Sequence, residues 1–302
     1  MKRGGKEREK GERIPRRAFL AGGAAYALAA PAPEGRKHSA FEKVTLGKTG
    51  IVTTRLGFGT GASSWNRTSA IVRKNGEDGA ARLVRDAYDR GVRFFDVADA
   101  YGTHALVRAA LKGLPRSSYV LATKYAWNGG IPAADRADVA TSIDRFLREL
   151  GTDYLDVVQI HCVTDAAWPT KLAPHMEALA AAKRAGKIRA HGCSFHSFGA
   201  LEVAANTPWL DVAHVRINPF GRNMSAHPDR VMPVLRRMHA QGQGVIGMKI
   251  LGVGSLAKDP AKMDKSIAYA LDSGVVDVLN IGFTALGEVD DIVRRIAAVP
   301  CR

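Results

Sequence analysis

Three stretches decide the fold: RFFDVADAYG (93–102), YVLATKYA (119–126) and LDVVQIHCV (155–163). Each contains an apolar run rich in β-branched or aromatic residues, as is typical of a buried strand. Each run stops at a polar residue, and a loop followed by helical periodicity comes next. The pattern predicts parallel strands joined by helices, with the carboxyl ends of all strands on one face.

The same strand-then-helix unit repeats along the chain, and no region contains strands alone. Eight such units predict a closed (β/α)8 TIM barrel of the α/β class rather than an open sheet. An open sheet that holds a dinucleotide would need Gly-x-Gly-x-x-Gly after its first strand, whereas LGFGTGASSW (56–65) stands there. Residues 41–61 predict a β-hairpin that turns at 47–50, followed by the first strand of the barrel. The expected strands are 54–60, 92–98, 118–124, 155–161, 188–194, 212–218, 244–250 and 276–282, and the expected helices are 79–90, 103–113, 136–150, 174–185, 198–205, 228–241, 261–273 and 287–298.

The first forty residues form a separate segment. MKRGGKEREKGERIPRR (1–17) is basic, AFLAGGAAYALAA (18–30) is apolar and rich in small residues, and PAPEG (31–35) follows. This order is typical of an export signal, and Arg16-Arg17 resembles a twin-arginine (Tat) signal. The alternative is a disordered basic tail. We expect a signal and linker at 1–40, a barrel domain at 41–302, the Tat export machinery as a partner, and a periplasmic or otherwise exported location.

The composition narrows the classes of partner. The net charge is +15, but the basic residues outside the first segment form no run and no nucleic-acid motif, so we expect a solvated basic surface and no nucleic acid. No apolar stretch approaches the roughly 20 residues that span a bilayer, which predicts no stable membrane insertion. The three cysteines lack metal-ligand spacing, and we expect no metal.

Four polar side chains at consecutive strand ends suit proton transfer at a carbonyl. Tyr101 can donate a proton to the carbonyl oxygen, and an adjacent Lys124 ammonium is expected to lower the pKa of the phenol. Asp96 holds the lysine, and His161 donates a hydrogen bond to the same oxygen. None of these groups can supply a hydride, so the reaction needs a nicotinamide.

Asp-x-Ala-x-x-Tyr-Gly, a strand-end Lys and Gln-Ile-His resemble the catalytic tetrad of the aldo-keto reductases. LGKTGIVTTRLGFGTG (46–61), LRELGTDYLDVVQIH (147–161) and AAAKRAGKIRAHGCS (180–194) resemble further segments of that family, so the resemblance covers 41–299. It implies a (β/α)8 barrel that interconverts a carbonyl (aldehyde, ketone or sugar) and an alcohol with NADP or NAD. It also implies the catalytic residues Asp96, Tyr101, Lys124 and His161.

The resemblance also assigns a cofactor site, with departures from the family pattern. Arg216 stands where many members carry Gln, and Met248-Lys249 replaces Tyr-Ser. Glu288 falls near a position that often holds a basic residue for the 2′-phosphate of NADP. The last substitution leaves the choice between NADP and NAD open. The expected cofactor-binding residues are Gly59, Thr60, Gly61, Ser194, Arg216, Met248, Lys249, Leu251 and Thr284.

Two loop aromatics, Trp65 and Trp127, are candidates for the substrate pocket, with loop packing as the alternative. Strand alternation predicts that Cys162 and Cys193 both face the helices, as free thiols without a catalytic role. Two other functions stay open: a non-catalytic cofactor-binding barrel that acts as a sensor or partner subunit, and a barrel enzyme of other chemistry, such as a sugar isomerase. An isomerase would need paired carboxylates or a metal cluster at the strand ends, and the sequence shows neither.

Overall fold

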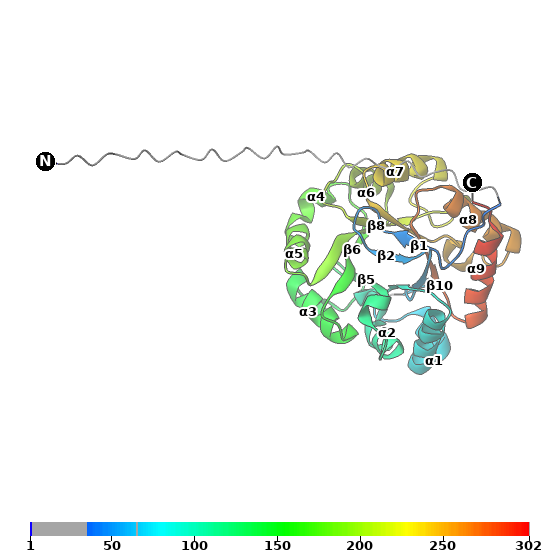
Figure 1. The fold of residues 1–302 in the computed structure, drawn as a ribbon, viewed down its shortest axis with the longest axis horizontal. Coiled ribbons are helices and arrows are strands. Elements are labelled where there is room, and N and C mark those ends of the chain that lie inside the picture. Colours follow the sequence, from blue (N-terminus) through cyan, green and yellow to red (C-terminus); the bar gives the residue numbers. More distant parts are fainter. Residues whose placement is uncertain (2–34, 65, 302) are drawn as a thin grey trace. The chain divides into compact units, whose positions relative to one another are not determined.

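A computed structural model describes Met1 and residues 35–64 and 66–301, and within that part eight parallel strands close into a barrel surrounded by helices (Figure 1). The (β/α)8 prediction is confirmed. Each strand pairs with its neighbours in chain order, and β10 closes the barrel against β3. The barrel strands are β3 (Leu56–Gly59), β4 (Phe94–Asp96), β5 (Val120–Tyr125), β6 (Leu155–Val163), β7 (Ile188–Phe195), β8 (Val212–Arg216), β9 (Gly244–Met248) and β10 (Val278–Gly282).

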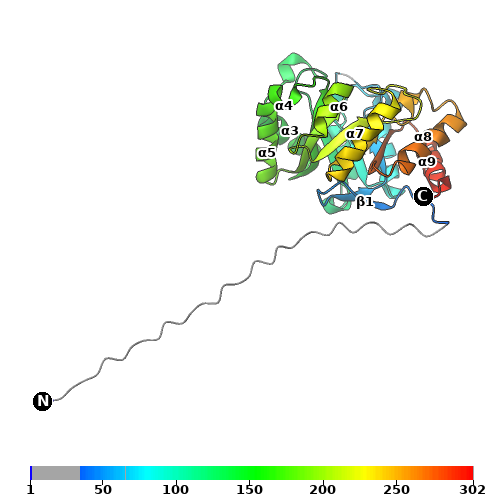
Figure 2. The same cartoon turned by 90° about the horizontal axis from the view of Figure 1, so that it is seen from above.

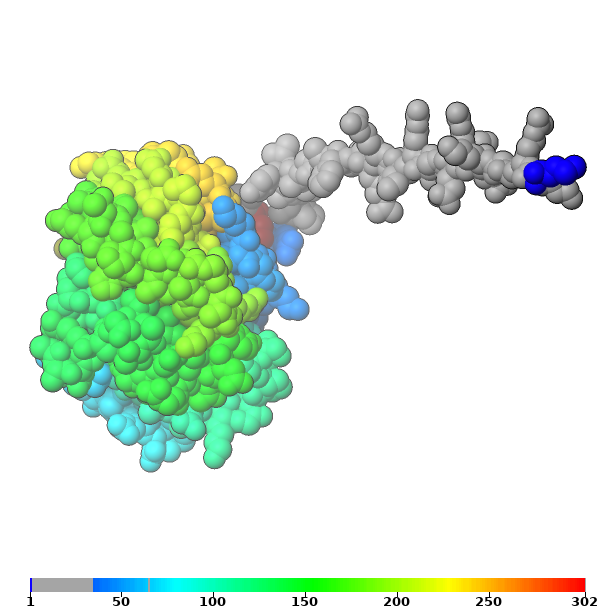
Figure 3. Space-filling view, turned by 90° about the vertical axis from the view of Figure 1, so that its left-hand side faces the viewer, coloured from blue at the N-terminus to red at the C-terminus, as the bar shows by residue number. Residues whose placement is uncertain are grey.

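The helices cover the outside of the barrel and bury one apolar face each. The amphipathic α3, for example, packs Ile143 and Phe146 inward and ends at Gly151 in a left-handed conformation. The middle part of the chain, coloured green, covers one flank as a continuous surface (Figure 3). The helices are α1 (Ala70–Asp89), α2 (His104–Leu111), α3 (Val139–Leu150), α4 (Trp168–Lys171), α5 (Ala173–Arg184), α6 (Phe198–Ala204), α7 (Pro228–Ala240), α8 (Pro260–Asp272) and α9 (Leu286–Ala298).

Two helices differ from the sequence-based expectation. The first begins at Ala70 rather than at 79, and it breaks at Gly76, which adopts a positive φ of 67°. The glycine and the polar residues around it hide the first turns from a periodicity argument. The short helix α4 was not expected, because four residues are too few to show helical periodicity.

A β-hairpin closes one end of the barrel. Its strands β1 (Lys43–Thr45) and β2 (Val52–Thr54) pair antiparallel, which confirms the predicted hairpin. Leu46 and Ile51 are fully buried and join the apolar cluster inside the barrel. Figures 1 and 2 show the hairpin across the barrel axis at one end. The polar side chains at the carboxyl ends of the strands therefore define the other end as the place for a site.

The described residues include no helix with the length and apolar character needed to cross a bilayer. The predicted export signal lies outside these residues, apart from Met1. Residues near the predicted end of the linker contact the barrel: His38 N donates to Val299 O at 3.0 Å, and Ala40 is buried. The boundary at residue 40 stays a prediction.

Candidate functional site

A buried ion pair lies at the end of the barrel that carries the predicted catalytic residues. Lys124 on β5 donates a hydrogen bond to Asp96 Oδ1 at the end of β4, and also to Val97 O at 3.2 Å. Asp96 is 3% exposed and Lys124 is 1% exposed. Neighbouring strands bring the two side chains together, because β4 and β5 pair in register. Such a pair holds both charges in fixed positions, since neither can be solvated on its own.

Tyr101 lies beside this ion pair, on a single 3₁₀ turn, Asp99–Tyr101, that follows β4. The Lys124 ammonium is 5.0 Å from the centre of the Tyr101 ring, and the His161 ring centre is 5.5 Å away. Gly61 gives the ring its space, because a Cβ at that position would lie 2.2 Å from two ring carbons. The structure therefore brings together all four predicted catalytic side chains.

The electrostatics at Tyr101 differ from the sequence-based expectation. Burial, together with the nearby Asp96 carboxylate, raises the pKa of the Tyr101 phenol well above its usual range. The expected lowering by Lys124 does not prevail, because burial is the largest influence on the phenol and the ammonium is already bonded to Asp96. At neutral pH the phenol keeps its proton, which is the form that donates to a carbonyl oxygen.

His161 is also uncharged at neutral pH. Burial lowers the pKa of its imidazole well below the usual value, and the Lys124 cation lowers it further. A neutral imidazole retains one N–H that can donate to an oxygen. The backbone oxygen of His161 accepts a hydrogen bond from Trp127 Nε1 at 2.9 Å, which ties the indole to the end of β6.

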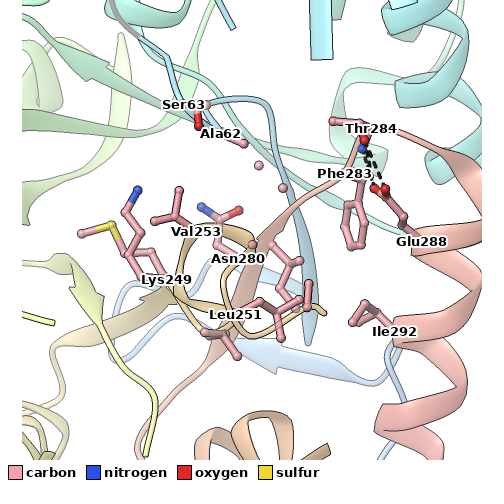
Figure 4. A pocket seen from close by; sticks show the side chains of 18 of the residues that line it. Ala62, Ser63, Lys249, Leu251, Val253, Asn280, Phe283, Thr284, Glu288 and Ile292 are labelled. Carbon is pink, nitrogen blue, oxygen red and sulfur yellow. Dashed lines mark hydrogen bonds between the residues drawn. The ribbon is translucent and has the colours of Figure 1, made fainter. Parts of the chain in front are cut away.

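A cavity of about 600 Å³ extends from Tyr101, Lys124 and Asp96 to the start of α9. Figure 4 shows Lys249 on one side of it, Thr284 and Glu288 on the other, and Asn280 between them. Six of the predicted cofactor-binding residues line this cavity: Gly59, Gly61, Met248, Lys249, Leu251 and Thr284.

Three other predicted cofactor residues lie outside the lining. Thr60 is buried, and its hydroxyl donates to Asp96 O at 2.9 Å, so it supports the end of β4. Ser194 is fully buried, and its Oγ accepts a hydrogen bond from Cys162 N at 2.8 Å. Arg216 stands at the end of β8 beside Met248 of β9, but it does not contact the cavity.

The two predicted pocket tryptophans have different outcomes. Trp127 is half-buried near His161, with its ring 6.4 Å from that of His175, and it does not line the cavity. Its role at the substrate stays a prediction. Trp65 lies outside the described residues.

The structure shows two site residues that the sequence argument missed. Asn280 Nδ2 donates to Asp96 Oδ2 at 2.8 Å, and it lies 3.3 Å from Nε2 of the fully buried His214. Burial and the Lys124 cation lower the pKa of His214 well below its usual value, so the ring is neutral. The sequence did contain a signal for both residues: each is a polar residue at an inward position of an otherwise apolar strand, and such a residue needs a partner when it is buried.

The far end of the cavity is the N-terminus of α9. There Glu288 Oε2 accepts hydrogen bonds from Thr284 N at 2.7 Å and Ala285 N at 3.3 Å. Lys74 of α1 donates to Thr284 Oγ1 at 3.0 Å. A carboxylate therefore already satisfies the N–H groups that would otherwise attract an anion to this helix end.

Cys162 contradicts the simple alternation expected along β6. The pairing of β6 with β7 shifts between Ile160 and Val163, and Cys162 has a φ of 56°. Its Sγ lies 3.7 Å from His196 Nε2, at the carboxyl end of the strands rather than under the helices. Cys193 is buried in the layer under the helices, as expected, and both thiols are free.

The geometry can perform one kind of chemistry well. It offers a protonated phenol beside a fixed ion pair at one end of the cavity, and a neutral imidazole that lies next to the phenol but outside the cavity lining. Two hydrogen-bond donors that converge on one oxygen suit a carbonyl that gains electrons. Among residues 35–64 and 66–301, no group of three or more His, Cys, Asp or Glu side chains could hold a metal ion.

A sequence profile of the Aldo/keto reductase family matches residues 55–293. The aldo-keto reductase YhdN of Bacillus subtilis is 32% identical over 197 residues, which cover 61% of this chain and 56% of that protein. L-galactose dehydrogenase of Arabidopsis thaliana is 32% identical over 231 residues, covering 70% of this chain and 66% of that protein. The matched segments thus span somewhat more than half of these two relatives.

The fold recurs in solved structures. A protein described as an aldo-keto reductase from Pseudomonas aeruginosa has a TM-score of 0.69 at 24% identity, covering 87% of this chain and 97% of the other. An aldo/keto reductase from Klebsiella pneumoniae, solved with NADP and acetate, has a TM-score of 0.64 at 20% identity, covering 85% of this chain and 91% of the other. At these identities the likeness shows the fold.

Proposed function

The chain belongs to the aldo/keto reductase family, and from that premise we propose that it is an NAD(P)H-dependent oxidoreductase that interconverts a carbonyl and an alcohol. The observation that carries the proposal is the packing of Tyr101 against the buried Asp96–Lys124 pair, with the His161 ring centre 5.5 Å from that of Tyr101. The substrate class is a small aldehyde, ketone or sugar.

The cavity fits a nicotinamide dinucleotide. The amide oxygen of Asn280, near the tetrad, is buried without a hydrogen-bond partner and can accept from a carboxamide. Lys258 also lines the cavity and offers a cation to a pyrophosphate. Thr284 and Glu288 stand at the far end, where the adenosine would lie. When bound, the nucleotide supplies the hydride.

The protein's own residues then manage the oxygen and its proton. His161 Nε2 or Nδ1, whichever carries the hydrogen, donates to the carbonyl oxygen and polarises it. Tyr101 transfers its phenolic proton to the same oxygen as negative charge develops there. Lys124 lies over the ring and stabilises the phenolate that remains, while Asp96 keeps the ammonium in place. In the oxidation direction the phenolate removes the alcohol proton.

Oxidation of NADH and NADPH with a panel of aldehydes and sugars tests the proposal. We expect turnover with both nucleotides, and dissociation constants that differ by less than about tenfold, because the Glu288 carboxylate opposes a 2′-phosphate and can bind a ribose hydroxyl. Glu288→Gln is expected to shift the ratio towards NADPH. Asp290→Asn, an exposed change on the same helix, is the control.

Two results would count against this account in different ways. Tight nucleotide binding without turnover of any compound would favour the sensor or partner-subunit alternative. A preference for NADPH well above about tenfold in the unchanged protein would show that Lys74, Lys258 or Arg295 outweighs Glu288 at the adenosine end.

We further propose export by the Tat route, on the strength of Arg16-Arg17 and the apolar segment that follows them. Replacing both arginines by lysine is expected to leave the protein in the cytoplasm, because the signal is read as an arginine pair rather than as charge alone. Cell fractionation with immunodetection measures this. Undiminished recovery from the periplasm would exclude the route.

A further inference from the structure

Two cations at the catalytic end have no acidic partner. Arg216 ends β8, and Lys249 directly follows Met248, the β9 residue that pairs with Arg216. Both side chains are half-buried. Within the described part of the chain, neither forms an ion pair or a side-chain hydrogen bond, and Arg216 Nε is buried without a partner.

The other half-buried arginines in the described part of the chain all have hydrogen-bond partners: Arg93 donates to Tyr88 O and Val92 O, and the rest bond to an acid. Arg116 is 19% exposed and bonds to Asp156 at 2.7 Å, and Arg145 is 22% exposed and bonds to Asp99 at 2.6 Å. Arg216 and Lys249 therefore depart from the way the chain treats its other half-buried arginines. Burying unpaired charge is unfavourable, and placing two like charges together adds repulsion. An arrangement that lowers stability at a catalytic end is typical of a ligand site.

The electrostatics agree with this geometry. Burial lowers the pKa of Lys249, and the Arg216 cation lowers it further. Burial also lowers the pKa of Arg216. An anion between the two side chains would reverse both effects, since opposite charge favours the protonated forms.

The position of Arg216 points to the substrate rather than to the nucleotide. Arg216 lies outside the lining of the cavity assigned to the nucleotide. Burial lowers the pKa of His196 and the Arg216 charge lowers it further, and the His196 ring centre lies 6.4 Å from that of His161. In space, the Tyr101 ring neighbours that of His161, which in turn neighbours that of His196. This series of rings connects the phenol with the surroundings of Arg216.

We propose that Arg216, with Lys249 beside it, binds an anionic oxygen group of the substrate, so that carbonyl compounds carrying a carboxylate or a phosphate are preferred over neutral ones. The guanidinium fork matches either group with two parallel hydrogen bonds. This inference rests on the proposed oxidoreductase function and adds the substrate class to it.

The test compares acids with their neutral esters. kcat/KM is measured for succinic semialdehyde and 4-carboxybenzaldehyde against their methyl esters, and for glyceraldehyde 3-phosphate against glyceraldehyde. We expect the charged member of at least one pair to be preferred by about tenfold to a hundredfold, as for a charge-assisted hydrogen bond. The pair that shows the preference distinguishes carboxylate from phosphate.

Variants show whether Arg216 is responsible. Arg216→Gln is expected to bring the ratio of charged to neutral substrate close to one, and Arg216→Lys to keep part of it. Arg237→Gln, which removes the same charge from an exposed site on α7, should leave the ratio unchanged. The nucleotide dissociation constant is measured in each variant, because an equal loss there would make Arg216 a cofactor ligand and overturn the inference.

Failure of the inference and failure of the function are separable. Equal turnover of acids and esters by the unchanged protein overturns the anion site and leaves the oxidoreductase intact. If no compound is turned over, the proposed function fails. In that case calorimetric titration with benzoate and with inorganic phosphate measures whether Arg216 binds an anion. Binding that Arg216→Gln abolishes upholds the anion site, and absence of binding to the unchanged protein overturns it.

Discussion

Asp96→Asn is expected to lower the free energy of unfolding by about 3–5 kcal/mol, because it leaves the Lys124 ammonium buried without a counter-charge. Lys124 is 1% exposed, and its other acceptor is Val97 O, a neutral oxygen at 3.2 Å. The same change is expected to reduce activity strongly, since the ammonium loses the group that positions it beside Tyr101. Urea unfolding and steady-state kinetics measure the two effects.

Two further variants separate stability from chemistry. Asp96→Asn combined with Lys124→Met removes both charges, so much of the lost stability is expected to return while activity stays absent. Asp156→Asn is the matched control, because Asp156 is equally buried and paired with Arg116 and Arg189, away from the site. It should lower stability and leave kcat near that of the unchanged protein. Recovery of activity in the double variant would contradict the assigned role of Lys124.

The fold was predictable because its signal is repeated. Each strand combines an apolar run with a following amphipathic helix, and eight such units admit few arrangements other than a barrel. The tetrad was predictable for a related reason, since parallel strands place their carboxyl ends together whatever the loops do. The ion pair of Asp96 with Lys124 follows from the pairing of β4 with β5 in register.

Other features of the site depend on local geometry that cannot be predicted from the alternation of side chains along a strand. The bulge in β6 turns Cys162 towards His196, and no residue pattern in LDVVQIHCV predicts a bulge at that position. The support that Asn280 gives to Asp96 joins strands 184 residues apart. The raised pKa of Tyr101 comes mainly from its burial in the folded chain, with the Asp96 carboxylate adding to it, whereas the lysine alone predicts the opposite direction.

The sequence identified Arg216 as a site residue, but it did not predict the role that the structure supports. The sequence comparison marked it as a departure within a cofactor site, whereas the structure places it beside the cavity, with an unpartnered guanidinium. Only the absence of an acid within reach, which is a property of the folded chain, distinguishes it from the paired arginines.

The central claim is that Tyr101 delivers the proton, and Tyr101→Phe tests it with the smallest change, because the ring that packs against Gly61 and Lys124 is retained. Removing a general acid costs about a hundredfold or more in rate. Nucleotide binding should persist, since Gly59, Met248, Lys249 and Thr284 are untouched. Tyr88→Phe is the control, since it removes a phenol that bonds to Ser118 far from the site.

The most direct measurement is the single-turnover rate of NADH or NADPH oxidation in Tyr101→Phe, with enzyme and nucleotide premixed at saturation and a reactive aldehyde added by stopped flow. The account predicts a rate lower by about a hundredfold or more, with a nucleotide dissociation constant within about threefold of the unchanged protein. A single-turnover rate close to that of the unchanged protein and of Tyr88→Phe would contradict it.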